Sequence, residues 1–402
     1  MSLDSASTRN RLILIFIALL FAAGFYYTKN TGGAGLMVPH ASAVWIVAVL
    51  AISIGIIILC RSRKIYLPHY WLGLAMLPLG FIISGFLAEV YRPLEWAFRI
   101  GFVTGGALFF FALFQYRPSR RTLESVLFFL VIASFLQSLI ALAQIHQLYS
   151  LQHWIPITPG KMGGSFQQYI MLASFLATGL VTSLYLLTVP GFAARSRLYK
   201  AMLYVSITFT ISFILASGSR VGLLGLLLGS LLLLLSRRRV LWKRKNRSIP
   251  MLIAIAIGIG YGFHLSDGLS RVEKTMQRDG YENHRYVIYE LSWDLFTEKP
   301  LFGHGLGSFP RVFQEKRIPF QKEHPNARSS PGMYSHPHNE ILFWLVEGGS
   351  VSVLGIIIAS TVTLIQLIRI GLSRGLAYMG LILPITLHTM TELPFYLSPA
   401  PL

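Results

Sequence analysis

The run VGLLGLLLGSLLLLLS at residues 221–236 contains no charged side chain, and the strongly basic run RRRVLWKRKNR follows it directly at residues 237–247. A helix of about 20 apolar residues crosses the hydrocarbon core of a bilayer. Clusters of arginine and lysine are typical of the cytoplasmic ends of such helices. The two runs therefore predict a helix that crosses a membrane and ends in the cytoplasm.

Apolar runs of this kind recur along the chain of 402 residues, of which 54% are hydrophobic and only 13% are charged. We predict eleven membrane spans, at residues 12–27, 43–60, 70–88, 97–115, 123–147, 166–189, 201–216, 221–236, 249–266, 339–368 and 376–391. The runs are continuous, whereas the strands of an outer-membrane barrel alternate in hydropathy. The predicted fold class is all-α, a polytopic transmembrane helical bundle. Because ordinary spans follow the first run, we expect no cleavable signal peptide there.

The charges of the predicted loops orient this bundle. With a cytoplasmic N-terminus, the inside segments carry most of the basic residues, including RSRK at 61–64 and RPSRR at 117–121. This is the asymmetry that the positive-inside rule describes. Anchoring beside anionic lipid headgroups then accounts for the net charge of +19, and no nucleic acid partner is required. Residues 29–42, 148–165 and 267–337 are predicted to lie outside the cytoplasm.

The predicted organisation has nine membrane helices in residues 1–266, a large outer loop with amphipathic helices at 267–337, and C-terminal membrane helices at 338–402. The loop is polar and balances its charges, so membrane anchoring does not explain it, and long loops often carry function. Within it, NHRYVIYELSWDLF (283–296) predicts an amphipathic helix. The segment KPLFGHGLGSF (299–309) lacks the strand and helix that flank a phosphate-binding loop, and predicts a glycine turn.

Two arginines stand at the predicted outer membrane edge. Arg220 lies in the turn FILASGSRVGLLG between two apolar runs, and Arg285 lies on the predicted amphipathic helix. Each has two interpretations. The guanidinium can be an ordinary surface cation at solvent or lipid headgroups, or it can hold a lipid-linked pyrophosphate through paired hydrogen bonds.

The stretch MYSHPHNEILFWLVEGG (333–349) places polar residues directly before an apolar helix. Proline is favoured at the first helical position, so we predict that the helix begins at Pro337, with His338 in its first turn. The positive end of a helix disfavours imidazolium, which would keep His338 neutral as a base. A purely capping role is the alternative. His336 is interpreted as a structural or acceptor-contacting neighbour.

Four more residues of this stretch are candidates for substrate binding together with His336. Asn339 lies in the predicted first turn, and Glu340, Trp344 and Glu347 follow at helical spacing on one face. Acids within membrane helices usually face the bundle interior or a cavity. Glu340 and Glu347 are therefore also alternative bases to His338.

Taken in order, these motifs resemble the O-antigen ligase and polymerase superfamily of membrane glycosyltransferases. The resemblance covers roughly residues 210–395 and rests on SGSR, the arginine of the outer loop, PLFGHGLGSF, the HN pair before a helix, and HTMTELPF at 388–395. In that family the corresponding two arginines and histidine form the functional trio. The resemblance thus implies Arg220, Arg285 and His338 as catalytic residues.

The resemblance implies an O-antigen ligase of lipopolysaccharide biosynthesis. Such an enzyme transfers a glycan from undecaprenyl pyrophosphate to lipid A–core at the periplasmic face of the bacterial inner membrane. The arginines would bind the pyrophosphate and His338 would deprotonate the acceptor, and direct displacement inverts the anomeric centre. We expect no cofactor and a metal-independent reaction, because the outer loop shows no metal-ligand spacing and Cys60 is the only cysteine.

Family members usually have twelve spans, whereas this sequence predicts eleven and ends just after the last. The alternatives are an O-antigen polymerase, a protein O-oligosaccharyltransferase and a membrane transporter. A polymerase would show glycine eleven positions after its arginines, which is absent at Arg220 and Arg285. The protein glycosyltransferases are generally longer. A transporter would place polar residues near the membrane midplane, whereas here they gather at the outer face.

Overall fold

The computed structural model describes residues 5–25, 38–157, 162–265, 284–327 and 333–393. Within these ranges every regular element is helical, which confirms the predicted all-α class. The α-helices are α1 (Ala6–Ala23), α2 (Val38–Ser62), α3 (Trp71–Leu87), α4 (Pro93–Tyr116), α5 (Arg120–Ile145), α6 (Tyr169–Thr188), α7 (Arg197–Ser217), α8 (Arg220–Lys243), α9 (Lys245–Leu265), α11 (His284–Glu298), α12 (Phe309–Glu323), α13 (Glu340–Arg369) and α14 (Leu372–Thr389). Short 3-10 turns, η1 (Tyr149–Leu151), η2 (Gly164–Phe166) and η3 (Pro190–Ala194), lie between some of them.

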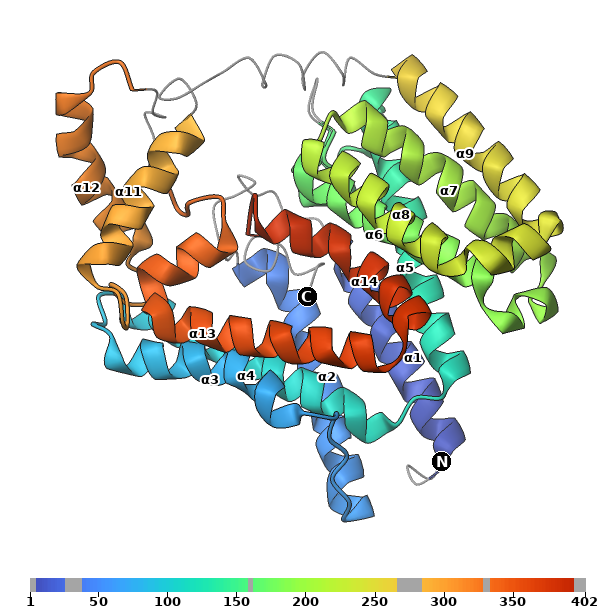
Figure 1. Ribbon diagram of the computed structural model, residues 1–402, viewed down its shortest axis with the longest axis horizontal. Coiled ribbons are helices and arrows are strands. Elements are labelled where there is room, and N and C mark those ends of the chain that lie inside the picture. The colour runs from blue at the N-terminus through green and yellow to red at the C-terminus, as the bar shows by residue number, and fades with distance from the viewer. Residues whose placement is uncertain (1–4, 26–37, 158–161, 266–283, 328–332, 394–402) are drawn as a thin grey trace.

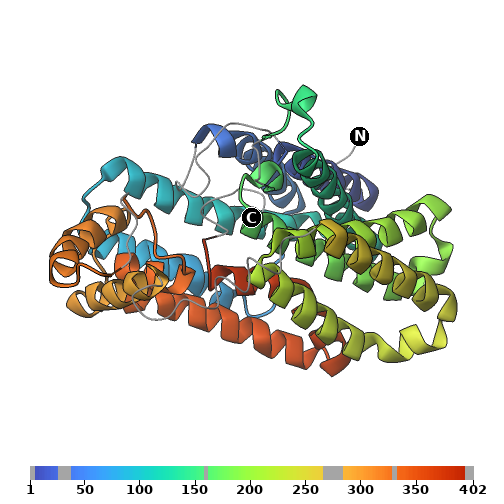
Figure 2. The same ribbon diagram turned by 90° about the horizontal axis from the view of Figure 1, so that it is seen from above.

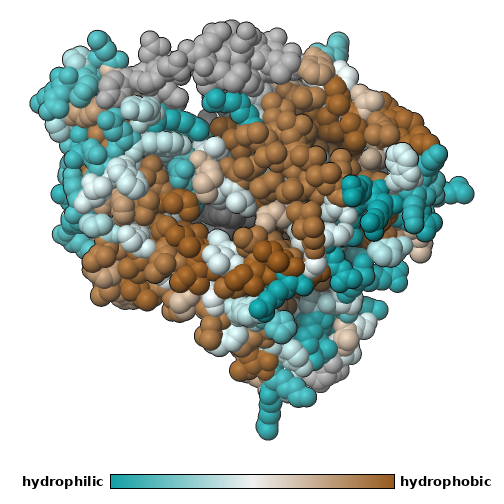
Figure 3. Space-filling view, viewed as in Figure 1, coloured by the Kyte–Doolittle hydropathy of each residue, from teal (hydrophilic) through white to brown (hydrophobic). Residues whose placement is uncertain are grey.

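Each predicted membrane span overlaps a helix, namely α1 to α9, α13 and α14, although α1 begins and ends earlier than the predicted span at 12–27. In the part of the chain that the structure describes, nine of these helices are long and apolar enough to cross a membrane; the other two are α3, which has only 17 residues, and α14. Figure 3 shows broad apolar surface over the α7–α9 side and the α13 side, and mostly hydrophilic surface over α11 and α12. The protein is therefore a multi-pass membrane protein.

Parts of several predicted features lie outside the described residues. These are the portions of the predicted outer loops at 29–37, 158–161, 267–283 and 328–332, and the last two residues of HTMTELPF.

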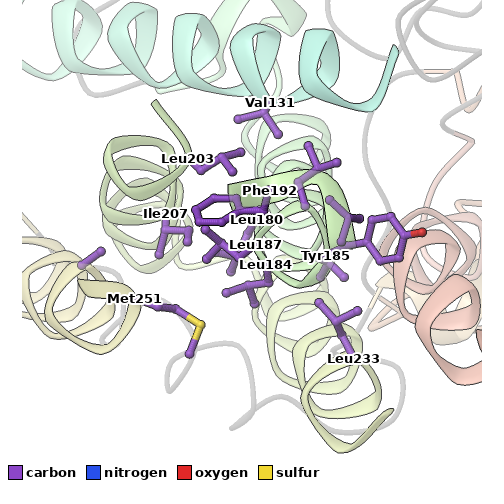
Figure 4. Close-up of a cluster of buried hydrophobic side chains, with 14 of the residues drawn as sticks. Val131, Leu180, Leu184, Tyr185, Leu187, Phe192, Leu203, Ile207, Leu233 and Met251 are labelled. Atoms are coloured by element: carbon purple, nitrogen blue, oxygen red, sulfur yellow. The ribbon is translucent and has the colours of Figure 1, made fainter. Parts of the chain in front are cut away.

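Helices α5 to α9 and α14 form one half of the bundle (Figures 1 and 2), with α6 at its centre. Most of α6 is buried. Figure 4 shows Leu180, Leu184 and Leu187 of α6 meeting Leu203 of α7 and Leu233 of α8. The side chains interdigitate as they do in other close-packed protein interiors, so this half forms a firm support for the turns at its ends.

The other half contains α2, α3, α4 and α13, and α13 lies along α3 (Figures 1 and 2). Small residues mark their crossing, since Gly80 of α3 faces Gly355 of α13. A Cβ added at Gly355 would collide with the carbonyl oxygen of Met76. Glycines at helix crossings let the two backbones approach closely, as is common between membrane helices.

Helices α11 and α12 form a separate layer at one end of the molecule, at the left of Figures 1 and 2. A helix thus forms where NHRYVIYELSWDLF predicts one. Its apolar residues Val287, Ile288, Leu291 and Leu295 pack into a core shared with α12, α13 and α3. The spacing of three and four residues places them on one helical face. The layer is therefore held against the start of α13 by apolar packing, while Trp293 on α11 stays half exposed.

A break in α13 receives the glycine-rich segment between α11 and α12. Gly349 has φ 64° and ψ −166°, which interrupts the helical backbone, and a Cβ there would collide with the carbonyl oxygen of Leu301. The N–H of Gly305 donates to the carbonyl oxygen of Glu347 at 3.0 Å. The three glycines of the segment all have positive φ, namely Gly303, Gly305 and Gly307. Positive φ is the conformation that glycine adopts readily, and the predicted glycine turn is confirmed.

Candidate active site

His338 lies just before α13 and outside the helix. Its φ is +55°, in the left-handed region, and α13 begins at Glu340 with Asn339 as its N-cap. The Oδ1 of Asn339 accepts a hydrogen bond from the Leu342 N–H at 2.9 Å. The prediction that the helix begins at Pro337 is therefore wrong. Asparagine is among the best N-cap residues, and its capping bond outweighs the preference of proline for the first turn.

The His338 side chain is oriented by Glu392, which follows α14. Its Nδ1 lies 2.8 Å from Oε1 of Glu392, a residue that is only 3% exposed. A carboxylate accepts hydrogen bonds, so Nδ1 is the protonated nitrogen of a neutral His338. The lone pair then lies on Nε2, as in the histidine of a catalytic triad. Glu392 is also suited to stabilise the imidazolium that forms when Nε2 takes a proton.

Two further basic side chains surround Glu392. The Nδ1 of His336 lies 4.0 Å from Oε2, and a guanidinium nitrogen of Arg285 lies 3.7 Å from Oε1. Burial raises the pKa of Glu392, but the hydrogen bond from His338 and the nearby His336 and Arg285 outweigh burial and leave the pKa below its ordinary value. Glu392 therefore remains a carboxylate at neutral pH.

Two hydrogen bonds join the segments that carry these groups. The Tyr289 hydroxyl of α11 donates to the His338 carbonyl oxygen at 3.3 Å, and Nδ2 of Asn339 donates to the Met390 carbonyl oxygen at 3.1 Å. Burial raises the pKa of Tyr289, so its hydroxyl stays protonated as a donor. The structure thus brings Arg285, His336, His338 and Asn339 together.

Arg220 is the first residue of α8, and Ser219 caps that helix. Its side chain is exposed and makes no hydrogen bond or ion pair with the other described residues. Helices α8 and α14 run antiparallel, because Gly225 lies against Pro384 and Gly229 lies against Gly380. Arg220 therefore stands at the same end of the bundle as the segment that follows α14. Arg220 is thus at the same end of the bundle as Glu392, but it does not contact Glu392, His338 or Arg285.

Glu340 and Trp344 lie on one face of α13, as the sequence predicts. The Trp344 indole N–H donates to Oε1 of Glu340 at 3.0 Å, and the indole ring stacks on Phe81 at 3.8 Å between centroids. Trp344 is buried in the core beneath α11 and α12. These contacts hold the first turns of α13 against α3, and so support the His338 backbone.

Glu347 is fully buried and its carboxylate is already used by protein groups. It pairs with Arg99 of α4 and accepts hydrogen bonds from the Gly307 and Phe309 N–H groups at 3.1 and 3.0 Å. Arg99 also pairs with Glu95 at 2.8 Å. A buried carboxylate needs a charge partner and hydrogen bonds of this kind. Glu347 therefore anchors the glycine turn, and the structure does not bring it to His338.

Two cavities are lined by residues of this site: His338 and Glu392 line one, and Asn339 and Met390 line the other. One is a polar pocket of about 190 Å³, lined by Gln168, Met333, Tyr334, Ser335, His336, His338 and Glu392. The other is an apolar groove of about 470 Å³, lined by Tyr289, Trp293, Asn339, Ile341, Leu342, Leu345 and Met390. His338 lines the polar pocket, and residues of the helix that follows it line the groove.

Residues 205–359 match the family model of the O-antigen ligase. This match supports a place for the chain in the O-antigen ligase superfamily. No curated protein matches it. The matched region contains Arg220, Arg285 and His338, so the family-like part of the chain supplies the three residues that the sequence motifs single out. Glu392 lies beyond the matched region.

Among the described residues, His336, His338 and Glu392 are a group that could hold a metal ion, since their ligand atoms lie within 4.8 Å of one another. Two imidazoles and a carboxylate suit a divalent transition metal. A metal would compete with the hydrogen bond between His338 and Glu392. Sequence spacing did not reveal this group, because its carboxylate is 54 residues from His338.

Sequence reasoning also missed Glu392 as a candidate site residue. The motif HTMTELPF contains Glu392, so a signal was present, but nothing local indicated that this acid would lie beneath a histidine. Arg99 was missed for the same reason, because it sits in an apolar run far from Glu347.

Proposed function

We propose that this protein is an O-antigen ligase that transfers a glycan from undecaprenyl pyrophosphate to lipid A–core at the periplasmic face of the inner membrane. One observation carries the proposal: a histidine oriented by a buried carboxylate lies beside Arg285, in a chain that matches the O-antigen ligase family model. Glycan transfer from a pyrophosphate needs a base for the acceptor hydroxyl and a cation for the pyrophosphate, and these two groups lie side by side here.

His338 is the proposed general base. With Nδ1 held by Glu392, its Nε2 takes the proton of an acceptor hydroxyl while that oxygen attacks the anomeric carbon of the donor sugar. The bond from the anomeric carbon to the pyrophosphate oxygen breaks, and the pyrophosphate leaves with the electron pair. Attack from the face opposite the leaving group inverts the anomeric centre.

The arginines are proposed to bind the leaving group. Arg285 lies at the cluster and Arg220 stands exposed at the same end of the bundle. Guanidinium groups grip phosphate oxygens with paired hydrogen bonds and stabilise the charge that grows as the anomeric bond breaks. Glu347 is proposed to act through the glycine turn and not by contact with substrate.

The apolar groove supports a lipid-linked donor. On α11, Arg285, Tyr289 and Trp293 follow one another at spacings of four, so they share one face of the helix. That face leads from a guanidinium to an indole in the groove. A ligand with an anionic head and an apolar chain matches this order of groups.

Reconstitution tests the proposal. Purified protein is incubated with undecaprenyl-pyrophosphate glycan and lipid A–core, and the products are separated by gel. Glycan on lipid A–core supports a ligase. Elongated undecaprenyl-linked glycan without that product would instead indicate a polymerase, and glycan on added protein acceptors would indicate a protein glycosyltransferase.

The proposed orientation predicts that α12 faces the periplasm. In a Cys60→Ser background, a cysteine at Glu315, which is exposed on α12, should react with a membrane-impermeant maleimide in intact spheroplasts. Lys64→Cys in the same background is the matched control, because Lys64 is exposed in a segment predicted to be cytoplasmic, and it should react only after permeabilisation. The reverse pattern would overturn the orientation.

We also predict that transfer survives metal removal. Glu392 is already hydrogen-bonded to His338, and a base must keep its lone pair for the acceptor proton. The transfer rate with excess EDTA should stay within about twofold of the untreated rate. A loss on chelation that added Zn²⁺, Mg²⁺, Mn²⁺ or Ca²⁺ restores would show that His336, His338 and Glu392 hold a required metal.

A further inference from the structure

Two buried glutamines of α5 hold the turn that precedes α6. The Gln144 side chain donates to the Gly164 carbonyl oxygen at 3.0 Å and accepts from the Gly164 N–H at 2.9 Å. The Gln137 side chain donates to Oγ of Ser165 at 2.6 Å and accepts from the Ser165 N–H at 3.0 Å. Buried amides on a membrane helix are costly unless they are fully bonded, so this turn is held in one conformation.

The turn places Gln168 at the polar pocket. Gly164 and Gln167 have φ of +60° and +61°, which reverses the chain before α6 begins. Gln168 is the N-cap residue of α6, but its side chain does not cap the helix. Its amide makes no hydrogen bond to any other residue that the structure describes, and it lines the pocket together with His338 and Glu392.

The pocket offers a second polar atom that has no hydrogen bond. Oε2 of Glu392 is buried and accepts no hydrogen bond from the described residues, although its partner oxygen Oε1 receives His338. Leaving a buried carboxylate oxygen without a donor is costly. A ligand with hydroxyl groups would donate to Glu392 and exchange hydrogen bonds with the Gln168 amide, which is both donor and acceptor.

The position of His338, the proposed base, indicates that this pocket binds the acceptor and not the donor. A general base must lie within hydrogen-bond reach of the proton it removes, and His338 and the Glu392 that orients it both line this pocket. Under the proposed function the donor chain takes the apolar groove, which shares no lining residue with the polar pocket. The pocket is smaller than most ligand sites, with room for about one sugar.

We propose that this pocket is the acceptor subsite, and that Gln168 binds a hydroxyl group of the terminal acceptor sugar. The proposal rests on the proposed function. It makes Gln168 a specificity-determining residue supplied by a turn that lies outside the family-matched region, which begins at residue 205.

The test compares Gln168→Ala and Gln168→Met with wild type in the reconstituted reaction, while lipid A–core and donor are titrated separately. Both variants should raise the KM for lipid A–core about 3- to 10-fold, as expected for one lost hydrogen bond, with the donor KM unchanged. Methionine has nearly the size of glutamine without its amide. Gln152→Ala is the matched control, since this glutamine is exposed in the same α5–α6 connection and does not line the pocket.

Three outcomes would overturn the acceptor subsite. They are an unchanged KM for lipid A–core in both variants, a wild-type KM for lipid A–core in Gln168→Met, and an increase confined to the KM for the donor. Binding of isolated core oligosaccharide to the purified protein gives a second readout that needs no turnover, and Gln168→Met should weaken it by the same factor. If the wild-type protein elongates lipid-linked glycan instead, the ligase proposal fails. The Gln168 variants are then compared with wild type using lipid-linked glycan as the acceptor, and an unchanged KM for that acceptor would overturn the acceptor subsite as well.

Discussion

His338→Ala is expected to lower the transfer rate about 10²- to 10⁴-fold, the usual range for a positioned acid or base, while donor binding is largely retained. The imidazole acts on the acceptor proton, whereas the arginines hold the donor. Stopped-time transfer assays and a separate donor-binding measurement in detergent would distinguish the two effects. Full activity in His338→Ala together with its loss in Glu340→Gln would move the base to Glu340.

Glu392→Gln is expected to cause a loss of similar size. An amide presents no negative charge to His338, so neither the productive tautomer nor the imidazolium is stabilised. Combining Glu392→Gln with His338→Ala should cost little more than His338→Ala alone, because groups that act as a unit are not additive. Losses that simply multiply in the double variant would mean that Glu392 supports the fold and does not orient His338.

Arg220→Ala and Arg285→Ala should each abolish or nearly abolish transfer, with protein abundance largely intact. Both effects follow from the proposed grip on the donor pyrophosphate, so donor binding should weaken, in contrast to His338→Ala. Lysine keeps the charge but loses the planar fork, and Arg→Lys should restore little activity. Transfer assays measure the loss of activity and its rescue by lysine, and a donor-binding assay measures the weaker binding.

The matched control for the arginines is Arg311→Ala. Arg311 is exposed on α12, where it pairs with Glu315 at 2.8 Å and lies over the Tyr91 ring, so its loss removes a surface charge and two exposed contacts. It should leave transfer near normal. Near-normal transfer by Arg220→Ala and Arg285→Ala as well would return both arginines to the role of surface cations.

Helix positions could be predicted because they depend on local patterns. Long apolar runs must satisfy their backbone groups internally, and each predicted span overlaps a helix. The turn at Gly303, Gly305 and Gly307 could be predicted because positive φ is a local property that glycine tolerates. The helix start at Pro337 was wrong because two local preferences competed, and the capping bond of Asn339 prevailed.

The sequence predicted some residues of the candidate site but not the residues that contact them. Polar residues at the ends of apolar runs mark Arg220, Arg285 and His338, since polar groups at those places call for a partner. Their surroundings were not visible. Glu347 was predicted to face the bundle interior, and it does, but it meets Arg99 and the glycine turn and not the substrate side.

The sequence by itself determined the membrane-spanning helices, the charge asymmetry of the loops, the glycine turn and the three residues of the family motif. Only the tertiary structure decided that Glu392 holds His338, that Glu347 pairs with Arg99, and that Gln168 lines the polar pocket. The physical reason is the range of the forces involved. Hydropathy and backbone conformation act on neighbouring residues, whereas the partner of a buried charge is set by which helices pack together, over separations of 54 residues for His338 and 248 for Arg99.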